Sequence, residues 1–255
     1  MLRQTFLHVP GVGRRTELRL WGQGCDDWSL FLADPAKYSF GRSDRESVRR
    51  AIEQSEEALG EGRHQFFRRG LGRINAWRAL PEFAGSRVYL DIETDGGQGE
   101  SSITMIGLYD GRDFKCLVQG EDLANFPDII SHYSVIVTFA GWMFDLPVLE
   151  RAFGGLRFDQ IHVDLCPTLR QVGLRGGLKR IERELGVARD GEVDGLTGLD
   201  AVRLWRRYKR FDDEAALQRL IAYNRADVVN LERLSQIAYD RLRRQTMLPV
   251  QPTLW

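Results

Sequence analysis

The sequence has little cysteine and little histidine. The three cysteines, Cys25, Cys116 and Cys166, are an odd number without paired spacing, which argues against a disulfide framework and against a CxxC zinc site. The four histidines are scattered, and no helical pair of histidines forms a metal motif. Disulfide-stapled and zinc-ribbon classes are therefore not expected.

A long hydrophobic run and an excess of charge of one sign are also missing. The longest apolar stretch, 135–144, is interrupted by Thr138 and Gly141 and is too short to span a bilayer. No apolar segment follows Arg3 that could serve as a signal peptide. Lys+Arg and Asp+Glu both number 36, so binding of nucleic acid by bulk charge is not expected, although a local basic face remains possible. We expect a soluble protein of a reducing cytoplasm, without a membrane partner.

Composition is that of a globular protein. Hydrophobic residues make up 43% and charged residues 28% of the 255 positions, which excludes disordered and fibrous classes. The length suits one large α/β domain, or a domain of roughly 150 residues with an appended segment. The pattern changes near Arg87 from polar and helical to strand-like. We therefore predict a mainly helical N-terminal segment over 1–84, a sheet-containing domain over 85–245 and a tail over 246–255.

Hydrophobic periodicity predicts five strands and several helices in the larger part. The predicted strands are 88–94, 103–109, 114–118, 135–139 and 161–165, and the predicted helices are 123–132, one from Asp145, 178–185, 200–208 and 213–243. Antiparallel strands followed by strands alternating with helices indicate an α/β fold with a mixed sheet flanked by helices. In the N-terminal part we predict a helix over 16–21. A second, solvated helix should run from Asp44 to about Phe67, end near Gly70, and begin with a Ser43–Glu46 capping box.

Two carboxylates lie on one face of the first predicted strand. Asp91 and Glu93 are two residues apart, so their side chains share a face, while Val88, Leu90 and Ile92 occupy the other. Neighbouring carboxylates repel each other and resist ionisation, unless a cation or an acid–base role compensates. The alternative interpretation is an edge strand with a solvated polar face.

Two further carboxylates accompany helices. Asp227 lies on or beside the apolar stripe of the last predicted helix, with Tyr223 one turn earlier on the same face. A carboxylate that points at a core is costly without a partner, so the alternative is pairing with Arg225 or another arginine. Asp145 follows the apolar strand and opens a helix, where it could simply be an N-cap, with Pro147 in the first turn.

The order of these motifs resembles the DEDD superfamily of 3′→5′ exonucleases, which have a ribonuclease-H-like fold. A strand with DxE precedes FD at a strand–helix junction, and YxxxD follows in a C-terminal helix. Ala222 stands where histidine-type members carry histidine, so the chain resembles the tyrosine subgroup. Three stretches, LDIETDGG, TFAGWMFDLPVLE and HVDLCPTLR with GLKRIERELGV, make the region 85–243 similar to the YprB-like family.

This resemblance implies a nuclease with two divalent metals, Mg²⁺ or Mn²⁺, acting on the 3′ end of DNA or RNA. Asp91 would bridge both metals, Glu93 and Asp227 would complete one site, and Asp145 would support the other through water. Tyr223 would orient the attacking water. Independently, two cations about 3.5–4 Å apart supply the positive charge that an attacking hydroxide and a departing alkoxide need, and oxygen ligands suit hard cations.

Other activities remain open on the same fold. One alternative is an endonuclease that acts at junctions or flaps, and another is a catalytically weak nucleic-acid-binding module. The chain has Ala140 where family members usually carry asparagine in an NGxxFD loop, which bears on rate or substrate preference. His162 and Asp164 match an HxDL motif. We interpret both mainly as structural, with contact between His162 and the substrate as the alternative.

The N-terminal segment contains a glycine-rich turn. The stretch Val9-Pro10-Gly11-Val12-Gly13, with Thr16 opening a helix, resembles one helix-hairpin-helix turn. In such turns Gly11 and Gly13 would let backbone N–H groups approach a nucleic-acid phosphate at a helix N-terminus, with Arg14 and Arg15 adding charge. The alternative is an ordinary Pro-Gly loop.

Overall fold

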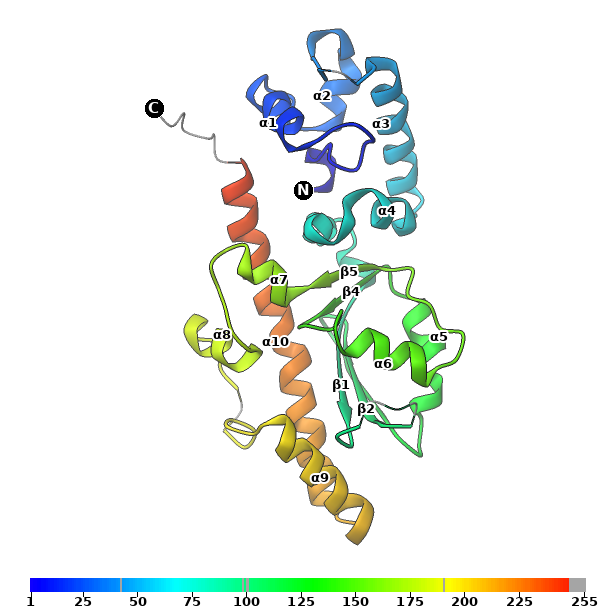
Figure 1. Ribbon diagram of the computed structural model, residues 1–255, viewed down its shortest axis with the longest axis vertical. Coiled ribbons are helices and arrows are strands. Elements are labelled where there is room, and N and C mark those ends of the chain that lie inside the picture. Colours follow the sequence, from blue (N-terminus) through cyan, green and yellow to red (C-terminus); the bar gives the residue numbers. More distant parts are fainter. Residues whose placement is uncertain (42, 98, 100, 190, 248–255) are drawn as a thin grey trace. The chain divides into compact units, whose positions relative to one another are not determined.

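The computed structural model describes residues 1–41, 43–97, 99, 101–189 and 191–247 (Figure 1). The chain divides into two compact units. The first comprises Met1–Ala84 with Tyr239–Trp255, and the second comprises Gly85–Ala238. The predicted tail over 246–255 lies outside the described residues from position 248 onward, and its first two positions belong to the last helix.

The second unit is built on a five-stranded mixed sheet. Its strands are β1 (Arg87–Thr94), β2 (Ile103–Tyr109), β3 (Phe114–Val118), β4 (Val135–Thr138) and β5 (Ile161–Asp164), in the order β3-β2-β1-β4-β5. Strands β1, β2 and β3 pair antiparallel, while β4 is parallel to both β1 and β5. The predicted mixed sheet is confirmed. Because β1 is central, the edge-strand interpretation of DxE is wrong.

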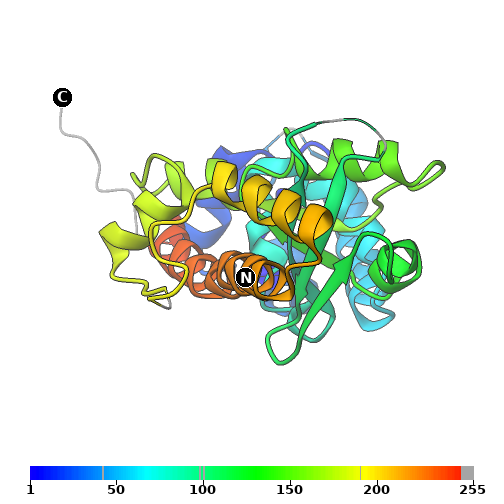
Figure 2. The ribbon, with the colours of Figure 1, turned by 90° about the horizontal axis from the view of Figure 1, so that it is seen from below.

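Helices cover both faces of this sheet (Figures 1 and 2). One face packs on α5 (Phe126–Ser131) and α6 (Asp145–Ala152), in a core that includes Leu90, Ile92 and Leu149. The other face packs on α9 (Gly198–Phe211) and α10 (Glu214–Met247), in a core that includes Met105, Trp205 and Leu220. Two shorter helices, α7 (Leu165–Arg170) and α8 (Leu178–Leu185), lie between β5 and α9 in the chain. Helix α7 was not expected from the sequence.

The first unit is mainly helical, as predicted. Its helices are α1 (Arg14–Gly22), α2 (Trp28–Ala33), α3 (Arg45–Gly60) and α4 (His64–Asn75), the last kinked at Gly72. Short 3₁₀ helices cover Leu2–Gln4, Pro35–Lys37, Ala76–Ala79, Ala84–Ser86 and Leu123–Asn125 in the two units. A buried ion pair between Glu17 and Arg78 lies in the core of this unit, where Thr5 also donates to Glu17. Because the two opposite charges are paired, the cost of burying them is reduced.

Three predictions for this unit were wrong. The single helix predicted from Asp44 to Phe67 is two helices, because Gly62 adopts a φ of 68° between α3 and α4. Ser43 is not the N-cap, since Asp44 accepts the backbone N–H of Ser47 at 2.9 Å. Helix α1 begins at Arg14, two residues before the predicted start. Among the described residues, no helix combines the length and the apolar character needed to cross a membrane.

Candidate metal centre

The two carboxylates of β1 lie on the sheet face that packs on α9 and α10. Asp91 is opposite Gly107 of β2, and Glu93 is opposite Met105, which belongs to the core on that face. Strand alternation sends Leu90 and Ile92 to the other core. The predicted division of β1 into a carboxylate face and an apolar face is therefore correct, but the carboxylate face is covered rather than solvated, and Glu93 is 8% exposed.

Helix α10 brings a third carboxylate to the pair. Ligand atoms of Asp91, Glu93 and Asp227 all lie within 4.8 Å of one another. Asp227 is 6% exposed, and Tyr223, one turn earlier on the same helix face, is 5% exposed. The donor set is entirely oxygen and negatively charged, which fits a hard divalent cation such as Mg²⁺ or Mn²⁺.

Asp145 contacts the same strand beyond the end of β4. It is the first residue of α6, and its Oδ1 accepts the backbone N–H of Ile92 at 3.2 Å. Strand β4 pairs with β1 only over residues 87–89, so beyond the end of β4 the backbone of β1 is available to Asp145. The N-cap of α6 is Phe144, so the interpretation of Asp145 as a cap is wrong. Asp145 is outside the group of three carboxylates above.

Burial raises the pKa of all four carboxyl groups, and repulsion by neighbouring carboxylates adds to this effect at Asp91, Glu93 and Asp145. Desolvation is the largest cause in each case. The pKa of Glu93 rises to about 8 and that of Asp145 to about 7, with Asp227 and other nearby carboxylates adding to the effect. The pKa of Asp91 is raised well above its ordinary value by burial and by the charges of Asp227, Asp145 and Glu93. A bound cation would relieve this repulsion, so the cluster fits a divalent metal.

Asn224 is a site residue that sequence reasoning missed. It is fully buried on α10, and its amide donates to Oδ2 of Asp91 at 3.1 Å. Asn224 occupies the space above Gly107, where a side chain would collide with it. The available signals were its place beside Tyr223 and a glycine inside an apolar strand, which often marks a close approach.

Lys179 is a second residue that was missed. From α8, its ammonium group donates to the hydroxyl of Tyr223 at 2.9 Å and to the carbonyl oxygen of Leu196, and lies 4.4 Å from the Tyr223 ring centroid. Burial, followed by the negative charges of Asp227, Glu93 and Asp91, raises the pKa of Tyr223. The phenol is therefore protonated at neutral pH.

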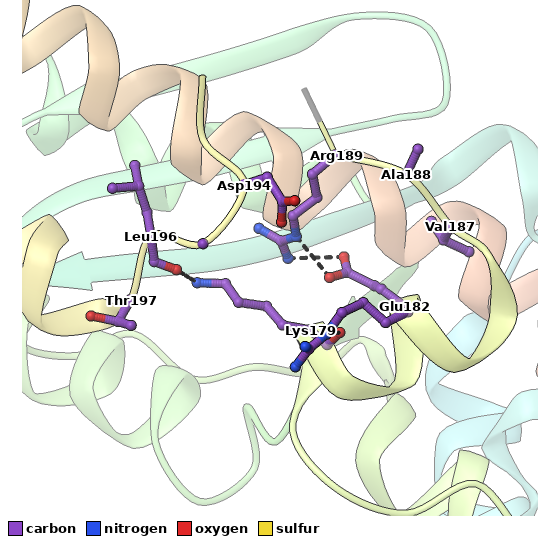
Figure 3. A pocket seen from close by; sticks show the side chains of 10 residues that line it. Lys179, Glu182, Val187, Ala188, Arg189, Asp194, Leu196 and Thr197 are labelled. Carbon is purple, nitrogen blue, oxygen red and sulfur yellow. Dashed lines mark hydrogen bonds and ion pairs between the residues drawn. The ribbon is translucent and has the colours of Figure 1, made fainter. Parts of the chain in front are cut away.

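Asp227 also pairs with an arginine, which the sequence left open as an alternative. The partner is Arg189, in the segment between α8 and α9, and not Arg225, whose guanidinium lies over the Phe114 ring. Arg189, Lys179 and Glu182 line a pocket of about 590 Å³ (Figure 3). Asp227 therefore both pairs with Arg189 and lies close to Asp91 and Glu93.

The loop before α6 explains how Ala140 is accommodated. Ala140 has a φ of 63°, in the left-handed region that asparagine and glycine tolerate better than alanine. Its backbone N–H donates to Oδ1 of Asp164 at 2.8 Å, and Asp164 also caps α7. His162 Nε2 lies 2.8 Å from Oγ1 of Thr138, and its ring stacks near that of Trp142. Asp164 and His162 therefore support the loop, and contact of His162 with a substrate stays a prediction.

The glycine-rich turn belongs to the first unit and is described by itself. Gly11 has a φ of 80°, Gly13 is the N-cap of α1, and Arg14 and Arg15 are exposed at the start of that helix. The element before the turn is a three-residue 3₁₀ helix, Leu2–Gln4, so only the second helix of a helix-hairpin-helix turn is formed as an α-helix among the described residues. Binding of nucleic acid by these four residues stays a prediction.

Comparison with known proteins gives a family and a structure. The family model described as the RNase_H superfamily matches residues 88–239, more than half of the chain. The crystal structure of Escherichia coli RNase D, described as an exoribonuclease involved in structured RNA processing, is similar with 18% identity and a TM-score of 0.40, covering 69% of this chain and 48% of that chain. The chain thus spans about half the length of that structure. No curated protein matches the chain.

Proposed function

Since the chain belongs to the RNase H superfamily, we propose that it is a metal-dependent nuclease that removes nucleotides from the 3′ end of DNA or RNA. The observation that carries this proposal is the convergence of Asp91, Glu93 and Asp227 within 4.8 Å, beside Tyr223 on α10. Assignment to the tyrosine subgroup of DEDD exonucleases, and to its YprB-like members, is part of the proposal.

The four carboxylates have a shared role in this proposal. Asp91, Glu93, Asp145 and Asp227 would hold two divalent cations, Mg²⁺ or Mn²⁺. When bound, such ions supply positive charge on both sides of the phosphorus atom. Asn224 fixes Asp91 by its hydrogen bond to Oδ2, and the backbone N–H of Ile92 fixes Asp145. Both carboxylates are therefore oriented before a substrate arrives.

Tyr223 orients the attacking water rather than deprotonating it. Its raised pKa keeps the phenol protonated, so it is not a general base at neutral pH. The ammonium group of Lys179 donates to the phenol oxygen, which leaves the phenolic hydrogen free to be donated to a water. Tyr223 thus holds a water at a fixed place beside the carboxylates.

End dependence is the test of this function. Labelled linear and circular single strands of DNA and RNA are incubated with the protein in Mg²⁺, in Mn²⁺ and in EDTA. We expect metal-dependent release of nucleotides from 3′ ends and intact circles. Cleavage of circles would instead indicate an endonuclease on the same fold, and retardation on a gel without cleavage would indicate a binding module.

We also propose that the turn of the first unit binds the nucleic-acid backbone through Gly11, Gly13, Arg14 and Arg15. The N–H groups at the start of α1 and the two exposed arginines support this. Replacing both arginines by alanine should weaken binding of a long strand and lessen its salt dependence. Cleavage of a very short oligonucleotide should be unaffected, and equal loss on short and long strands would contradict this role.

A further inference from the structure

Arg189 is the most deeply buried cation beside the carboxylates. Its side chain is 4% exposed, although it lies in the segment that connects α8 to α9. Its Nε donates to Oε2 of Glu182 at 2.7 Å, and its Nη2 donates to Oε1 of Glu182 at 2.8 Å and also to Oδ1 of Asp227. Arg189 therefore joins two carboxylates, one of which belongs to the candidate metal centre.

Glu182 holds the guanidinium in a fixed plane. The fork of two parallel hydrogen bonds restrains both the position and the tilt of Arg189. Asn230 of α10 donates to Oε1 of Glu182 at 2.9 Å and to the carbonyl oxygen of Ala188 at 3.3 Å. The second bond fixes the backbone next to Arg189. Hydrogen bonds thus hold both the guanidinium of Arg189 and the backbone beside it, so the guanidinium has a fixed position relative to Asp227.

The same face of α10 meets α8 and the segment after it at three successive turns. Tyr223 accepts from Lys179, Asp227 accepts from Arg189, and Asn230 donates to Glu182. Figure 3 shows the side chains of Arg189 and Glu182 pointing toward each other. The Lys179 side chain extends to the carbonyl oxygen of Leu196. Two of these three contacts involve residues of the proposed active centre, so α8 and the segment after it support α10 where the chemistry would occur.

We propose that Arg189 is a positioning residue that fixes the side chain of Asp227 for metal binding. The guanidinium of Arg189 donates to Oδ1 of Asp227, whereas Oδ2 accepts no hydrogen bond from any described residue. One carboxylate oxygen is therefore held while the other remains available to a cation. The proposal rests on the proposed function, because it takes Asp227 to be a metal ligand.

Charge alone makes the opposite prediction for this residue. A cation binds less tightly near another positive charge, so removing Arg189 should tighten metal binding if its charge were what mattered. The charge of Glu182 largely offsets that of Arg189, because the two are paired at hydrogen-bond distance. Loss of orientation should then dominate. Removal of groups that orient metal ligands typically weakens metal binding by about 10- to 100-fold.

Titration of the metal-free protein with Mn²⁺, without nucleic acid, separates these effects. Isothermal calorimetry gives the dissociation constant of the wild type, of Arg189→Gln and of Arg183→Gln. Arg183 lies on α8 and lines the same pocket, and its side chain donates to the backbone of Lys179 rather than to a carboxylate of the centre. We expect about 10- to 100-fold weaker binding in Arg189→Gln and no weakening in Arg183→Gln.

Other results of this titration would contradict the role of Arg189 or the proposed function. Unchanged or tighter Mn²⁺ binding in Arg189→Gln, or equal weakening in both variants, would overturn the role of Arg189. Failure of the wild type to bind Mn²⁺ would overturn the proposed function itself. Circular dichroism in EDTA checks that Arg189→Gln is folded. If it is not, Arg189→Lys takes its place, since lysine keeps the charge but cannot make the fork: weaker binding supports the proposal, and wild-type binding refutes it.

Discussion

A Cβ atom on Gly107 would lie 1.8 Å from Oδ1 of Asn224. Gly107 is the cross-strand neighbour of Asp91, and Asn224 donates to Oδ2 of Asp91. Because Gly107 has no side chain, β2 leaves room for the amide of Asn224, which orients Asp91 on the neighbouring strand β1. This relationship explains a glycine in the interior of a strand, where it otherwise costs stability.

Gly107→Ala should therefore destabilise the protein and disturb Asp91. We expect a loss of about 1–3 kcal/mol in the free energy of unfolding, as for other overpacked cores. Denaturant unfolding measures it. Gly198→Ala is the matched control, because no atom lies within 4 Å of a Cβ there, and it should leave stability nearly unchanged. If both variants have the same free energy of unfolding, the close contact with Asn224 does not explain the glycine at position 107.

Tyr223→Phe should lose turnover without losing affinity. The ring remains packed against Lys179, but the hydroxyl that would orient water is gone. We expect turnover to fall by about 10²–10⁴-fold with an unchanged dissociation constant for a single-stranded substrate, measured in EDTA. Tyr133→Phe removes a phenol hydroxyl from the same unit, on the side of the α5 and α6 core, and should have wild-type turnover. An unchanged rate in Tyr223→Phe would remove Tyr223 from the mechanism.

Asp227→Asn should raise stability in EDTA while abolishing cleavage. The pKa of Asp227 is raised because desolvation outweighs the favourable effect of Arg189, so a neutral group suits this position better than a carboxylate. We expect a higher melting temperature in EDTA and a smaller increase with Mg²⁺ or Mn²⁺. The exposed Asp113→Asn serves as the surface control. A lower melting temperature with unchanged metal response and activity would make the Arg189 ion pair purely structural.

The metal-free protein should lose stability as pH rises through neutrality. The folded-state pKa of Glu93, about 8, and that of Asp145, about 7, exceed the ordinary values of 4.5 and 3.8. The folded form thus binds protons more tightly than the unfolded form, and this stabilisation is lost as pH rises to about 8. Melting in EDTA between pH 6.5 and about 8 tests this, since the lowered pKa of His8, about 4 against 6.5, acts below that window. Glu93→Gln should flatten the decline, and a melting temperature that rises with pH would contradict the prediction.

Ala140→Gly should stabilise the loop before α6. Alanine at a φ of 63° costs about 1–2 kcal/mol, and glycine does not pay that cost. Because glycine also loses more entropy on folding, we expect a net gain of about 0.5–1 kcal/mol in denaturant unfolding. The same substitution in the interior of α3, Ala51→Gly, should instead destabilise by about 1 kcal/mol. Equal signs for the two variants would show that φ at Ala140 is not strained.

Local hydrophobic periodicity predicted most of the strands of the sheet. It failed where contacts between distant parts of the chain determine the structure. The strands Ile103–Tyr109 and Phe114–Val118 and the helix Leu178–Leu185 have the predicted bounds, because their periodicity and turns are local. The break between α3 and α4 falls at Gly60-Glu61-Gly62, a helix-stop signal that the prediction of a single helix overlooked.

The candidate site shows the same limit. The spacing of Asp91 and Glu93 predicted a shared face, and that of Tyr223 and Asp227 another. Neither spacing could reveal Asn224, Lys179 or Arg189, whose contacts join segments far apart in the sequence. The roles of these side chains depend on how α10 packs on β1, on α8 and on the segment after α8. The glycine inside β2 signalled a close approach there, but not which side chain makes it.

The hydrogen bond between Asn224 and Asp91 joins residues 133 positions apart. Contacts of such long separation close late in folding, because a large loop must be ordered before they form. The hairpin of β1 and β2 can form from neighbouring residues, but the third carboxylate arrives only when α10 docks on it. During synthesis, which proceeds from the N-terminus, nearly all of the second unit must be made before the carboxylates can assemble. The proposed ability to cut nucleic acid is therefore acquired late in folding, and a growing chain gains it only after α10 has been made.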